Sequence, residues 1–259
     1  MNPRLTLETP AIVLRRIDYG DADRIVTFFT ERYGKVKGIA KAARKSQKRF
    51  GNALEPFSLV KLFFNERRQT SLDFVVSCDV INHFPTLRED LSKTLTASYF
   101  IELTDLFTVE GKQSAAIFSL LKDFLCLLQY GASTEELMRF FEMRLLKLAG
   151  YEPELGRCLS CRRSIDEMNE LRFSADRGGI LCDVCCRQGL NTLPLSAGTA
   201  RMLTLANNMD LDKIRRIIPS RQALTESRLM MEQFIRHILG RELKSLKVIS
   251  EVNFFVRHS

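Results

Sequence analysis

The amino-acid sequence predicts an α+β protein of several domains, in which a small N-terminal β-barrel precedes an all-helical domain that a cysteine-rich insert interrupts. Three observations support this prediction. Short runs rich in Val, Ile and Phe occupy residues 10–80, and apolar residues three and four apart dominate most of the remaining chain. Two Cys-x2-Cys pairs lie between the helical blocks. The 259 residues are enough to bury a substantial core.

Five short strands are predicted in the N-terminal region, at residues 9–17, 24–30, 34–41, 56–64 and 71–77. In the last strand Leu72, Phe74 and Val76 alternate with polar residues, which predicts one buried and one half-solvated face. Five short strands in about 70 residues suit a barrel of the OB type, which presents one strand face to single-stranded nucleic acid. An SH3-like barrel fits the same pattern nearly as well.

Helical spacing begins after Pro85. It predicts helices at residues 95–107, 114–128, 134–148, 196–205 and 225–251. We therefore assign three parts to the chain: an OB-type nucleic-acid-binding domain at residues 1–82, a helical domain at residues 83–150 and 196–259, and the insert at residues 151–195.

The insert carries two Cys-x2-Cys pairs separated by 20 residues: Cys158, Cys161, Cys182 and Cys185. This spacing is typical of a zinc-ribbon-like site, in which four thiolates surround one zinc ion. A hairpin with strands at residues 171–173 and 180–181 would bring the two pairs together. Because four thiolates leave no open position for water or substrate, we expect a structural ion. It would replace the core that a segment of about 45 residues is too small to form.

Alternatives stay open around these cysteines. Cys186 is a tolerable substitute for Cys185, although the x2 spacing forms the tighter knuckle. Four independent buried thiols, or a redox Cys-x-x-Cys pair, explain the doubled spacing less well, and no βαβ pattern accompanies it. Cys78 and Cys126 fall on apolar patterns and are expected in the core. The flanking arginines suit either a nucleic-acid surface or a solvated exterior: Arg157, Arg162, Arg163, Arg172, Arg177 and Arg187.

The chain is basic, with a net charge of +8 and a pI near 9.2. The first 80 residues contain 15 Lys and Arg against 9 Asp and Glu, so they supply +6 of that charge. A basic surface attracts polyanions such as nucleic acids, although a solvated face that only aids solubility is the commoner explanation of charge. The candidates for phosphate contact are Arg15, Arg16, Arg24, Lys35, Lys37, Lys41, Arg44, Lys45, Lys48 and Arg49.

Most of these candidates lie between residues 34 and 50, a stretch that contains no acidic residue. If residues 34–41 form the third strand, alternation places Lys35, Lys37 and Lys41 on the outer face of the barrel. Residues 42–49 would then form a loop whose short side chains allow a phosphate chain to approach the backbone. Three aromatic residues are candidate stacking platforms for bases, of which the last suits a core position better: Tyr19, Tyr33 and Phe50.

Signals for catalysis, secretion and membrane insertion are missing from the sequence. It contains no G-x-G-x-x-G motif and no P-loop motif, and its three histidines are scattered, so we expect no enzymatic activity. No uninterrupted apolar run approaches the ~20 residues of a membrane helix, and the N-terminus lacks the pattern of a secretory signal. We expect a cytoplasmic protein whose cysteines are thiols or metal ligands.

Three separated segments resemble the RecO family of bacterial DNA-repair proteins, in the same order. Residues 9–64 are similar to its N-terminal domain. Residues 139–161, followed by GGILCDVC at residues 178–185, are similar to the junction of its helical domain and zinc module. Residues 239–249 are similar to its C-terminal helix.

The resemblance implies an OB domain, a helical domain with a zinc-ribbon-like insert, and no enzymatic activity. Members of the family bind single-stranded and double-stranded DNA and anneal complementary strands. With RecR, and in some species RecF, they load RecA onto DNA coated by single-strand-binding protein, whose tail they also contact. Some members lack the zinc cysteines, whereas this chain has four. The alternatives are a zinc-ribbon interaction scaffold and an RNA-binding or transcription accessory protein.

Overall fold

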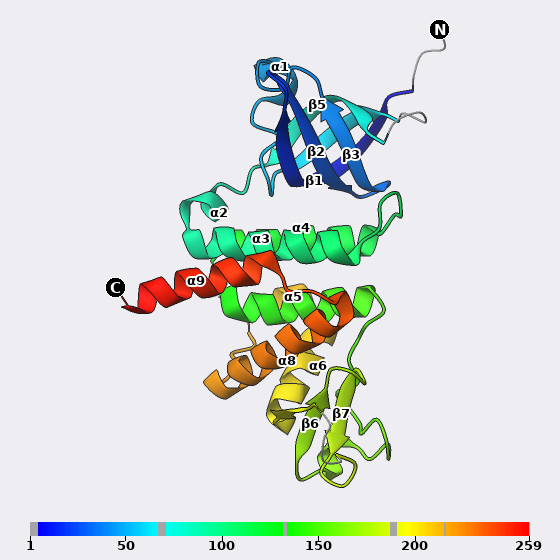
Figure 1. Cartoon of the computed structure of the whole chain (residues 1–259), viewed down its shortest axis with the longest axis vertical. Coiled ribbons are helices and arrows are strands. Elements are labelled where there is room, and N and C mark those ends of the chain that lie inside the picture. The colour runs from blue at the N-terminus through cyan, green and yellow to red at the C-terminus, as the bar shows by residue number, and fades with distance from the viewer. Residues whose placement is uncertain (1–4, 67–70, 132–133, 187–190, 215, 259) are drawn as a thin grey trace. The chain divides into compact units, whose positions relative to one another are not determined.

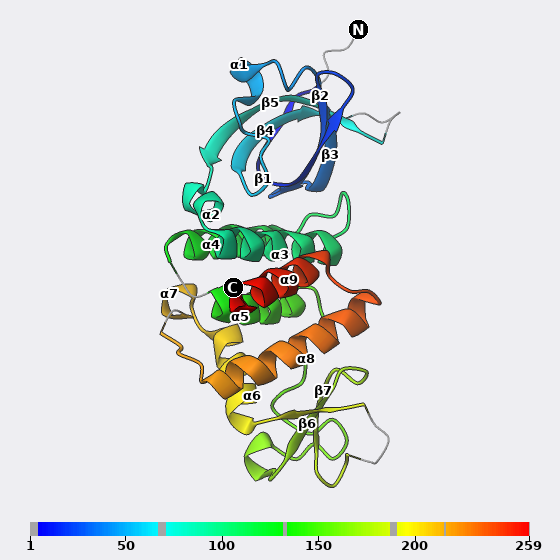
Figure 2. The same cartoon turned by 60° about the vertical axis from the view of Figure 1, so that its left-hand side comes forward.

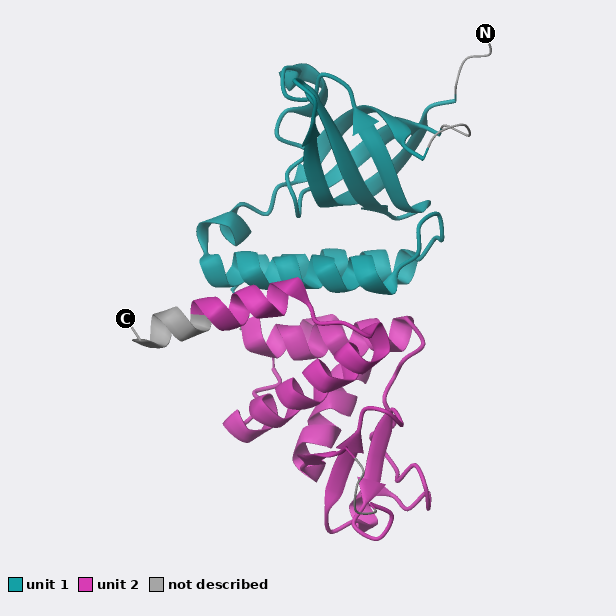
Figure 3. Cartoon of the chain, viewed as in Figure 1, with its two compact units in different colours: residues 1–131 teal, residues 132–259 magenta. Residues whose placement is uncertain are grey.

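The computed structural model describes residues 5–66, 71–131, 134–186, 191–214 and 216–258, and the side chains of the last helix up to residue 252 (Figure 1). The chain divides into two compact units, residues 1–131 and 132–259 (Figure 3). No helix in the described part of the chain is both long and apolar enough to cross a membrane.

The first unit begins with a closed five-stranded barrel, as predicted (Figures 1 and 2). Its strands are β1 (Leu7–Tyr19), β2 (Asp23–Thr30), β3 (Gly34–Ala40), β4 (Leu59–Asn65) and β5 (Asp73–Asn82). They follow one another around the barrel in the order β1-β2-β3-β5-β4, and only β3 and β5 run parallel within it. This is the arrangement of an OB-type barrel rather than the SH3-like alternative.

Apolar side chains from all five strands fill the barrel: Val13, Val26, Phe28, Val36, Leu62, Phe64 and Val75 belong to one buried cluster. In β5 the predicted inward face was wrong, because Val75 and Cys78 are buried whereas Phe74 and Val76 are half-buried. Phe63 pairs with Ser77 and Phe64 with Val75, so Val76 is an extra residue in β5. Such a bulge shifts the alternation by one residue, which a simple period of two does not anticipate.

Helices complete the first unit: α1 (Gln47–Phe50), α2 (Pro85–Glu89), α3 (Leu91–Phe107) and α4 (Ala115–Gln129). The Asp90 side chain accepts a hydrogen bond from the Lys93 backbone N–H and starts α3. Helices α3 and α4 lie side by side, with the rings of Phe100 and Phe124 5.9 Å apart (Figures 1 and 2). Phe118 of α4 lies 6.2 Å from Phe29 of β2, so helix α4 covers part of the outer barrel surface.

The helices of the second unit are α5 (Thr134–Leu148), α6 (Ala197–Asn208), α7 (Leu211–Ile214), α8 (Arg221–Leu239) and α9 (Lys244–His258). The prediction of one continuous helix at residues 225–251 was wrong. Gly240 ends α8 with a φ of 65°, and its N–H donates to the Arg236 carbonyl. A glycine in the left-handed region closes a helix in this way and redirects the chain, so α9 is separate.

The insert forms a three-stranded sheet in the order β7-β6-β8. Strands β6 (Leu171–Ser174) and β7 (Gly179–Cys182) make the predicted hairpin. The third strand, β8 (Leu193–Leu195), pairs with β6 and was not predicted, because three residues around a proline carry no strand pattern. The short helix η1 (Ile165–Glu167) precedes β6. The Phe173 ring meets the Phe234 ring of α8 edge to face at 5.5 Å, which ties the sheet to the helices.

Candidate nucleic-acid interface and metal centre

The outer face of β1–β3 carries a cross-strand row of polar side chains. Arg15 pairs with Thr27, and Thr27 pairs in turn with Lys37. Residues directly opposite each other in antiparallel strands point to the same side of the sheet, so the three side chains form a line across three strands. Arg15 and Lys37 are exposed, and neither has an acidic side chain within ion-pair distance among the described residues.

A shallow hollow of about 180 Å³ lies on this face. Arg15, Thr27 and Lys37 line it, together with Ile17 and Ile25, which pair with each other in the next row. Ile17 keeps 45% of its surface exposed. Two acids, Asp105 at the end of α3 and Glu110 in the α3–α4 connection, complete the lining beside Lys35. The hollow therefore combines free cations, apolar surface and carboxylates.

Lys35 also lines the hollow, but it is engaged within the protein. Its Nζ donates to the Asp105 carbonyl oxygen at 2.7 Å and to Asp105 Oδ1 at 2.9 Å. The alternation predicted for β3 is nevertheless present, because Val36 and Ala40 belong to the barrel core while Lys37 is exposed. Of the predicted bases of β3, Lys37 is the one with no ion pair in the described part of the chain.

The structure separates Arg16 and Arg24 from Arg15. The register of β1 and β2 shifts between Val13 and Arg15, and Arg16 then pairs with Val26, a core residue. Arg16 therefore points to the inner side of the sheet, at the end of the barrel, and Arg24 does the same opposite Ala40. A single continuous track through the three arginines does not form.

At this end of the barrel the arginines surround a carboxylate. The Arg16 guanidinium donates to Glu55, and Arg24 Nη1 lies 3.9 Å from Glu55 Oε1. Burial, and next the positive charge of Arg24, lower the pKa of Arg16. Arg88, which sequence reasoning missed, adds a third guanidinium and donates to the Pro56 carbonyl at 2.7 Å and to Ser58 Oγ at 3.2 Å.

The basic stretch after β3 is a turn followed by α1 rather than an open loop. Lys41 Nζ pairs with Asp23 Oδ2 at 2.5 Å, and the Ala42 N–H donates to Asp23 Oδ1 at 2.8 Å. The hydrogen bond from Lys41, followed by that from Ala42, lowers the pKa of Asp23. Arg49 donates to the Lys41 carbonyl at 2.7 Å, and Arg44 Nη1 approaches the Asp21 carbonyl at 3.4 Å.

Two lysines of this stretch remain available. Lys45 and Lys48 are exposed and have no ion-pair partner among the residues that the structure places. The three aromatic residues predicted to stack on bases differ from one another in how exposed they are. Phe50 is buried in the barrel core, and the Tyr33 ring packs against Phe64 at 5.4 Å. Tyr19 is 54% exposed.

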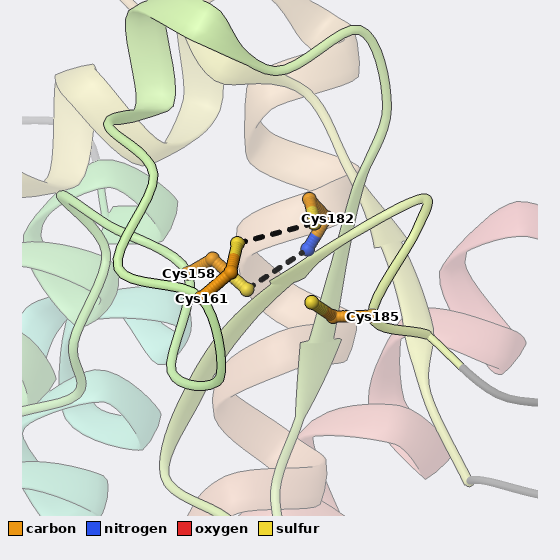
Figure 4. Close-up of side chains that lie close together, drawn as sticks. All are labelled: Cys158, Cys161, Cys182 and Cys185. Carbon is orange, nitrogen blue, oxygen red and sulfur yellow. Dashed lines mark hydrogen bonds between the residues drawn. The ribbon is translucent and has the colours of Figure 1, made fainter.

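The four predicted metal-binding cysteines come together (Figure 4). All four Sγ atoms lie within 4.8 Å of one another, and the Cys161 and Cys182 sulfurs are 3.7 Å apart. Zn–S bonds of about 2.3 Å in a tetrahedron place sulfurs about 3.8 Å apart, so the group fits one zinc ion. Cys186 lies outside the group, with its Sγ 3.7 Å from Thr192 Oγ1.

Local backbone geometry builds both cysteine knuckles. The Arg162 N–H donates to the Cys158 carbonyl at 3.0 Å, with Arg162 itself at a φ of 63°, and the Cys185 N–H donates to the Cys182 carbonyl at 3.1 Å. The Leu159 N–H bonds to the Ile180 carbonyl of β7 at 2.9 Å, which brings the first knuckle to the hairpin that carries the second.

The environment of the sulfurs affects their ionisation unequally. Burial opposes ionisation of Cys158, but N–H groups of Cys161, Cys182 and Ser160 outweigh it and lower the pKa of this thiol to about 6. Hydrogen bonds, first to Cys182 and then to Cys161, raise the pKa of Cys185 to about 12. For the two cysteines outside the insert, Cys78 and Cys126, the main cause is burial, which raises the pKa of both thiols.

Most arginines around the insert bond within the protein. Arg157 and Arg162 approach Glu154 at 3.4 and 4.0 Å. Arg172 Nε donates to Thr192 Oγ1 at 2.8 Å, and Arg177 Nη1 donates to Ser160 Oγ at 3.1 Å. Arg187 lies outside the described residues.

Comparison with known proteins identifies the family. A family model described as the N-terminal part of recombination protein O matches residues 1–84, and one described as its C-terminal part matches residues 88–247. The DNA repair protein RecO of Syntrophus aciditrophicus is 43% identical over 97% of this chain and 98% of its own length.

Two further relatives carry the same name. The DNA repair protein RecO of Desulfatibacillum aliphaticivorans is 36% identical over 94% of this chain and 96% of its own length. The one of Geobacter metallireducens is 35% identical over 94% of this chain and 97% of its own length. With an OB-type barrel, a helical region and both family models present, this chain belongs to the RecO family, which acts in DNA repair and recombination.

Proposed function

We propose that this chain is a recombination mediator that binds DNA and has no enzymatic activity of its own. The main structural support for this proposal is the row formed by Arg15, Thr27 and Lys37 on the outer face of β1–β3. Two cations without ion-pair partners on an outer strand face suit the phosphate chain of DNA, and OB-type barrels bind single strands on such a face. Lys45 and Lys48, which follow β3 in the chain, are exposed and add two further cations to the barrel surface.

Such a surface binds through phosphate charge and therefore accepts both single-stranded and double-stranded DNA. Annealing follows from the same physics, because a protein that neutralises phosphates lowers the repulsion between two complementary strands. The absence of enzymatic activity in this proposal rests on the sequence, which carries neither a dinucleotide-binding motif nor a P-loop motif.

Family membership supports the partners in this proposal. The chain would act in the cytoplasm, at the nucleoid, with RecR and in some settings RecF. It would load RecA onto single-stranded DNA coated by single-strand-binding protein, whose C-terminal tail it would contact. In this proposal residues 1–82 bind DNA, residues 83–150 and 196–259 form the helical domain, and residues 151–195 form the zinc-binding insert.

For the insert we propose one structural zinc ion, held by Cys158, Cys161, Cys182 and Cys185. When bound, the ion cross-links the two knuckles through four thiolates. The sulfur separations described above support this assignment. Metal analysis of the purified protein should then give about one zinc per chain.

The DNA-binding proposal is tested with the double variant Arg15→Gln/Lys37→Gln. Fluorescence anisotropy with a labelled single-stranded oligonucleotide, titrated with salt, gives the slope of log K against log salt. We expect this slope to shrink by up to about 1.4, which is about 0.7 for each phosphate contact removed. The control variant Lys93→Gln/Lys122→Gln loses the same charge on α3 and α4 and should keep the slope. An unchanged slope in the folded Arg15/Lys37 variant would contradict the proposal.

Strand annealing measures the mediator role directly. Complementary oligonucleotides should anneal faster with the wild-type chain than without it, both bare and coated by single-strand-binding protein. The Arg15/Lys37 variant should lose most of this acceleration. Competition between RNA and DNA of one sequence separates this proposal from an RNA-binding function, because a reader of the 2′-hydroxyl would favour RNA.

A further inference from the structure

We propose that the hollow on the outer face of β1–β3 binds one nucleotide of a single strand and favours bases that carry an exocyclic amino group, such as cytosine. The inference rests on the proposed function, because it concerns how the same face treats the strand that it binds. It goes beyond charge alone, since phosphate contacts carry no information about the base. The inference is based on two carboxylates, those of Asp105 and Glu110, in a hollow whose other charged residues are basic.

Carboxylates at this place need an explanation, because they repel the phosphates that Arg15 and Lys37 attract. Asp105 is partly accounted for by its ion pair with Lys35 at 2.9 Å. Glu110 is different, since its carboxylate has no ion-pair or hydrogen-bond partner among the residues that the structure describes. Its negative charge therefore weakens phosphate binding without stabilising a neighbouring side chain.

The backbone around Glu110 is fixed to the barrel. The Gly111 N–H donates to the Lys35 carbonyl at 3.3 Å, and Gln113 Nε2 approaches the Glu31 carbonyl at 3.4 Å. Gly34 has a φ of 65°, and a Cβ atom there would lie 2.3 Å from the Lys112 carbonyl oxygen. These hydrogen bonds attach the α3–α4 connection to β3 and the turn before it, and the glycine at position 34 leaves room for the close approach, so Glu110 lies beside the row of Arg15, Thr27 and Lys37.

The lining of the hollow matches the parts of one nucleotide. Arg15 and Lys37 suit a phosphate, and the exposed apolar surface of Ile17 with Ile25 suits a sugar or the face of a base. A carboxylate only accepts hydrogen bonds, so Glu110 and Asp105 favour a base edge that donates. The N4 amino group of cytosine donates, and acidic side chains accept from it in known complexes. Uracil and thymine carry a carbonyl oxygen in place of that amino group, so their edge offers a carboxylate one donor, N3–H, between two acceptors that repel it, whereas cytosine offers both hydrogens of its amino group.

The sharpest probe is a pair of oligonucleotides of equal length, oligo-dC and oligo-dU. Their bases differ in the amino or carbonyl group at ring position 4 and in the protonation of N3. Anisotropy at mildly alkaline pH and constant salt gives the affinity of the full-length protein for each. We expect the wild-type chain to bind oligo-dC about three- to tenfold more tightly than oligo-dU.

The variant Glu110→Gln should reduce this ratio to less than half of its wild-type value, because an amide can also donate to the uracil carbonyl. Glu89→Gln, on the exposed surface of α2, removes the same charge and should leave the ratio unchanged. Equal affinity of the wild-type chain for the two oligonucleotides would overturn the inference, as would a preference that survives in Glu110→Gln. Failure of the proposed function looks different, since neither oligonucleotide would then bind.

Discussion

The barrel and the cysteine insert differ in the side chains that form their buried clusters. The barrel encloses a cluster of large apolar side chains contributed by every strand, including Phe28, Leu62 and Phe64. In the insert, the buried cluster around the sulfurs comprises Cys158, Leu181 and Cys182, with half-buried side chains against it. The barrel therefore depends on the burial of apolar surface, whereas the insert, with the zinc ion proposed above, would depend in addition on the bonds from its sulfurs to the metal. Substitutions in the two regions should have separate and distinguishable effects.

The largest effect is expected from the variant Cys158→Ser/Cys161→Ser. Removing two of the four ligands abolishes tetrahedral zinc binding, whose free energy in small zinc modules is about 10–16 kcal/mol. The insert should unfold locally while the barrel stays folded. Hydrogen exchange followed by mass spectrometry should show lost protection in residues 151–195 and unchanged protection in residues 7–82. Equal zinc content in the variant would show that these cysteines are not the ligands.

A large effect in the other region is expected from Phe28→Ala. Phe28 is fully buried in the barrel, and its truncation leaves a cavity that should lower the free energy of unfolding by about 3–5 kcal/mol. Denaturant unfolding monitored by circular dichroism measures this loss. The zinc content should stay the same. A simultaneous loss of metal would show that the two regions are not stabilised independently.

A smaller effect is expected from Gly34→Ala at the junction of the barrel and the α3–α4 connection. The new Cβ would lie 2.3 Å from the Lys112 carbonyl oxygen, and the φ of 65° disfavours any residue except glycine. Backbone strain and displacement together should destabilise the first unit by about 2–4 kcal/mol. Thermal unfolding measures this loss of stability. The affinity for oligo-dC should also fall, because Glu110 moves with the connection.

The smallest effect is expected from Gly178→Ala in the hairpin of the insert. Its φ of 70° resembles that of Gly34, but a Cβ atom there would meet only the Phe234 ring, at 3.9 Å. The substitution should therefore cost about 1 kcal/mol, from the backbone conformation alone. Zinc affinity measured by competition with a chelator should fall by less than about tenfold. If Gly178→Ala lowered the free energy of unfolding by more than Gly34→Ala does, the surroundings of these two glycines would not decide the cost of the substitution.

Local patterns in the sequence predicted much of this architecture. Five runs of β-branched and aromatic residues gave the barrel strands, and the doubled Cys-x2-Cys spacing gave the four sulfurs that come together. Each strand run and each Cys-x2-Cys pair is a local signal, because it depends on residues a few positions apart, and the two cysteine pairs lie only 20 residues from each other. The break between α8 and α9 was also local, at Gly240, but its left-handed conformation was not anticipated.

What the sequence could not show depends on long-range pairing. Arg15 and Arg16 are adjacent in β1, so alternation puts them on opposite faces, but the register shift against β2 decides that Arg15 is the outer one and that Arg16 lies beside Glu55. The ion pair of Lys35 with Asp105 joins residues 70 positions apart. The sequence did not indicate a role for Glu110 either, because acidic residues are common in connections between helices. Only the fold shows that this one lies at the basic face of the barrel.

The attachment of the α3–α4 connection to the start of β3 has a kinetic consequence. The carboxylates and the strand face of the hollow belong to parts of the chain that hydrogen bonds join, so in the proposed function a DNA strand would meet a site that needs no ordering step. In stopped-flow mixing the observed association rate should then rise in proportion to oligonucleotide concentration, with no plateau. That rate should fall steeply with added salt, since the attraction between the basic side chains and the phosphates speeds the encounter.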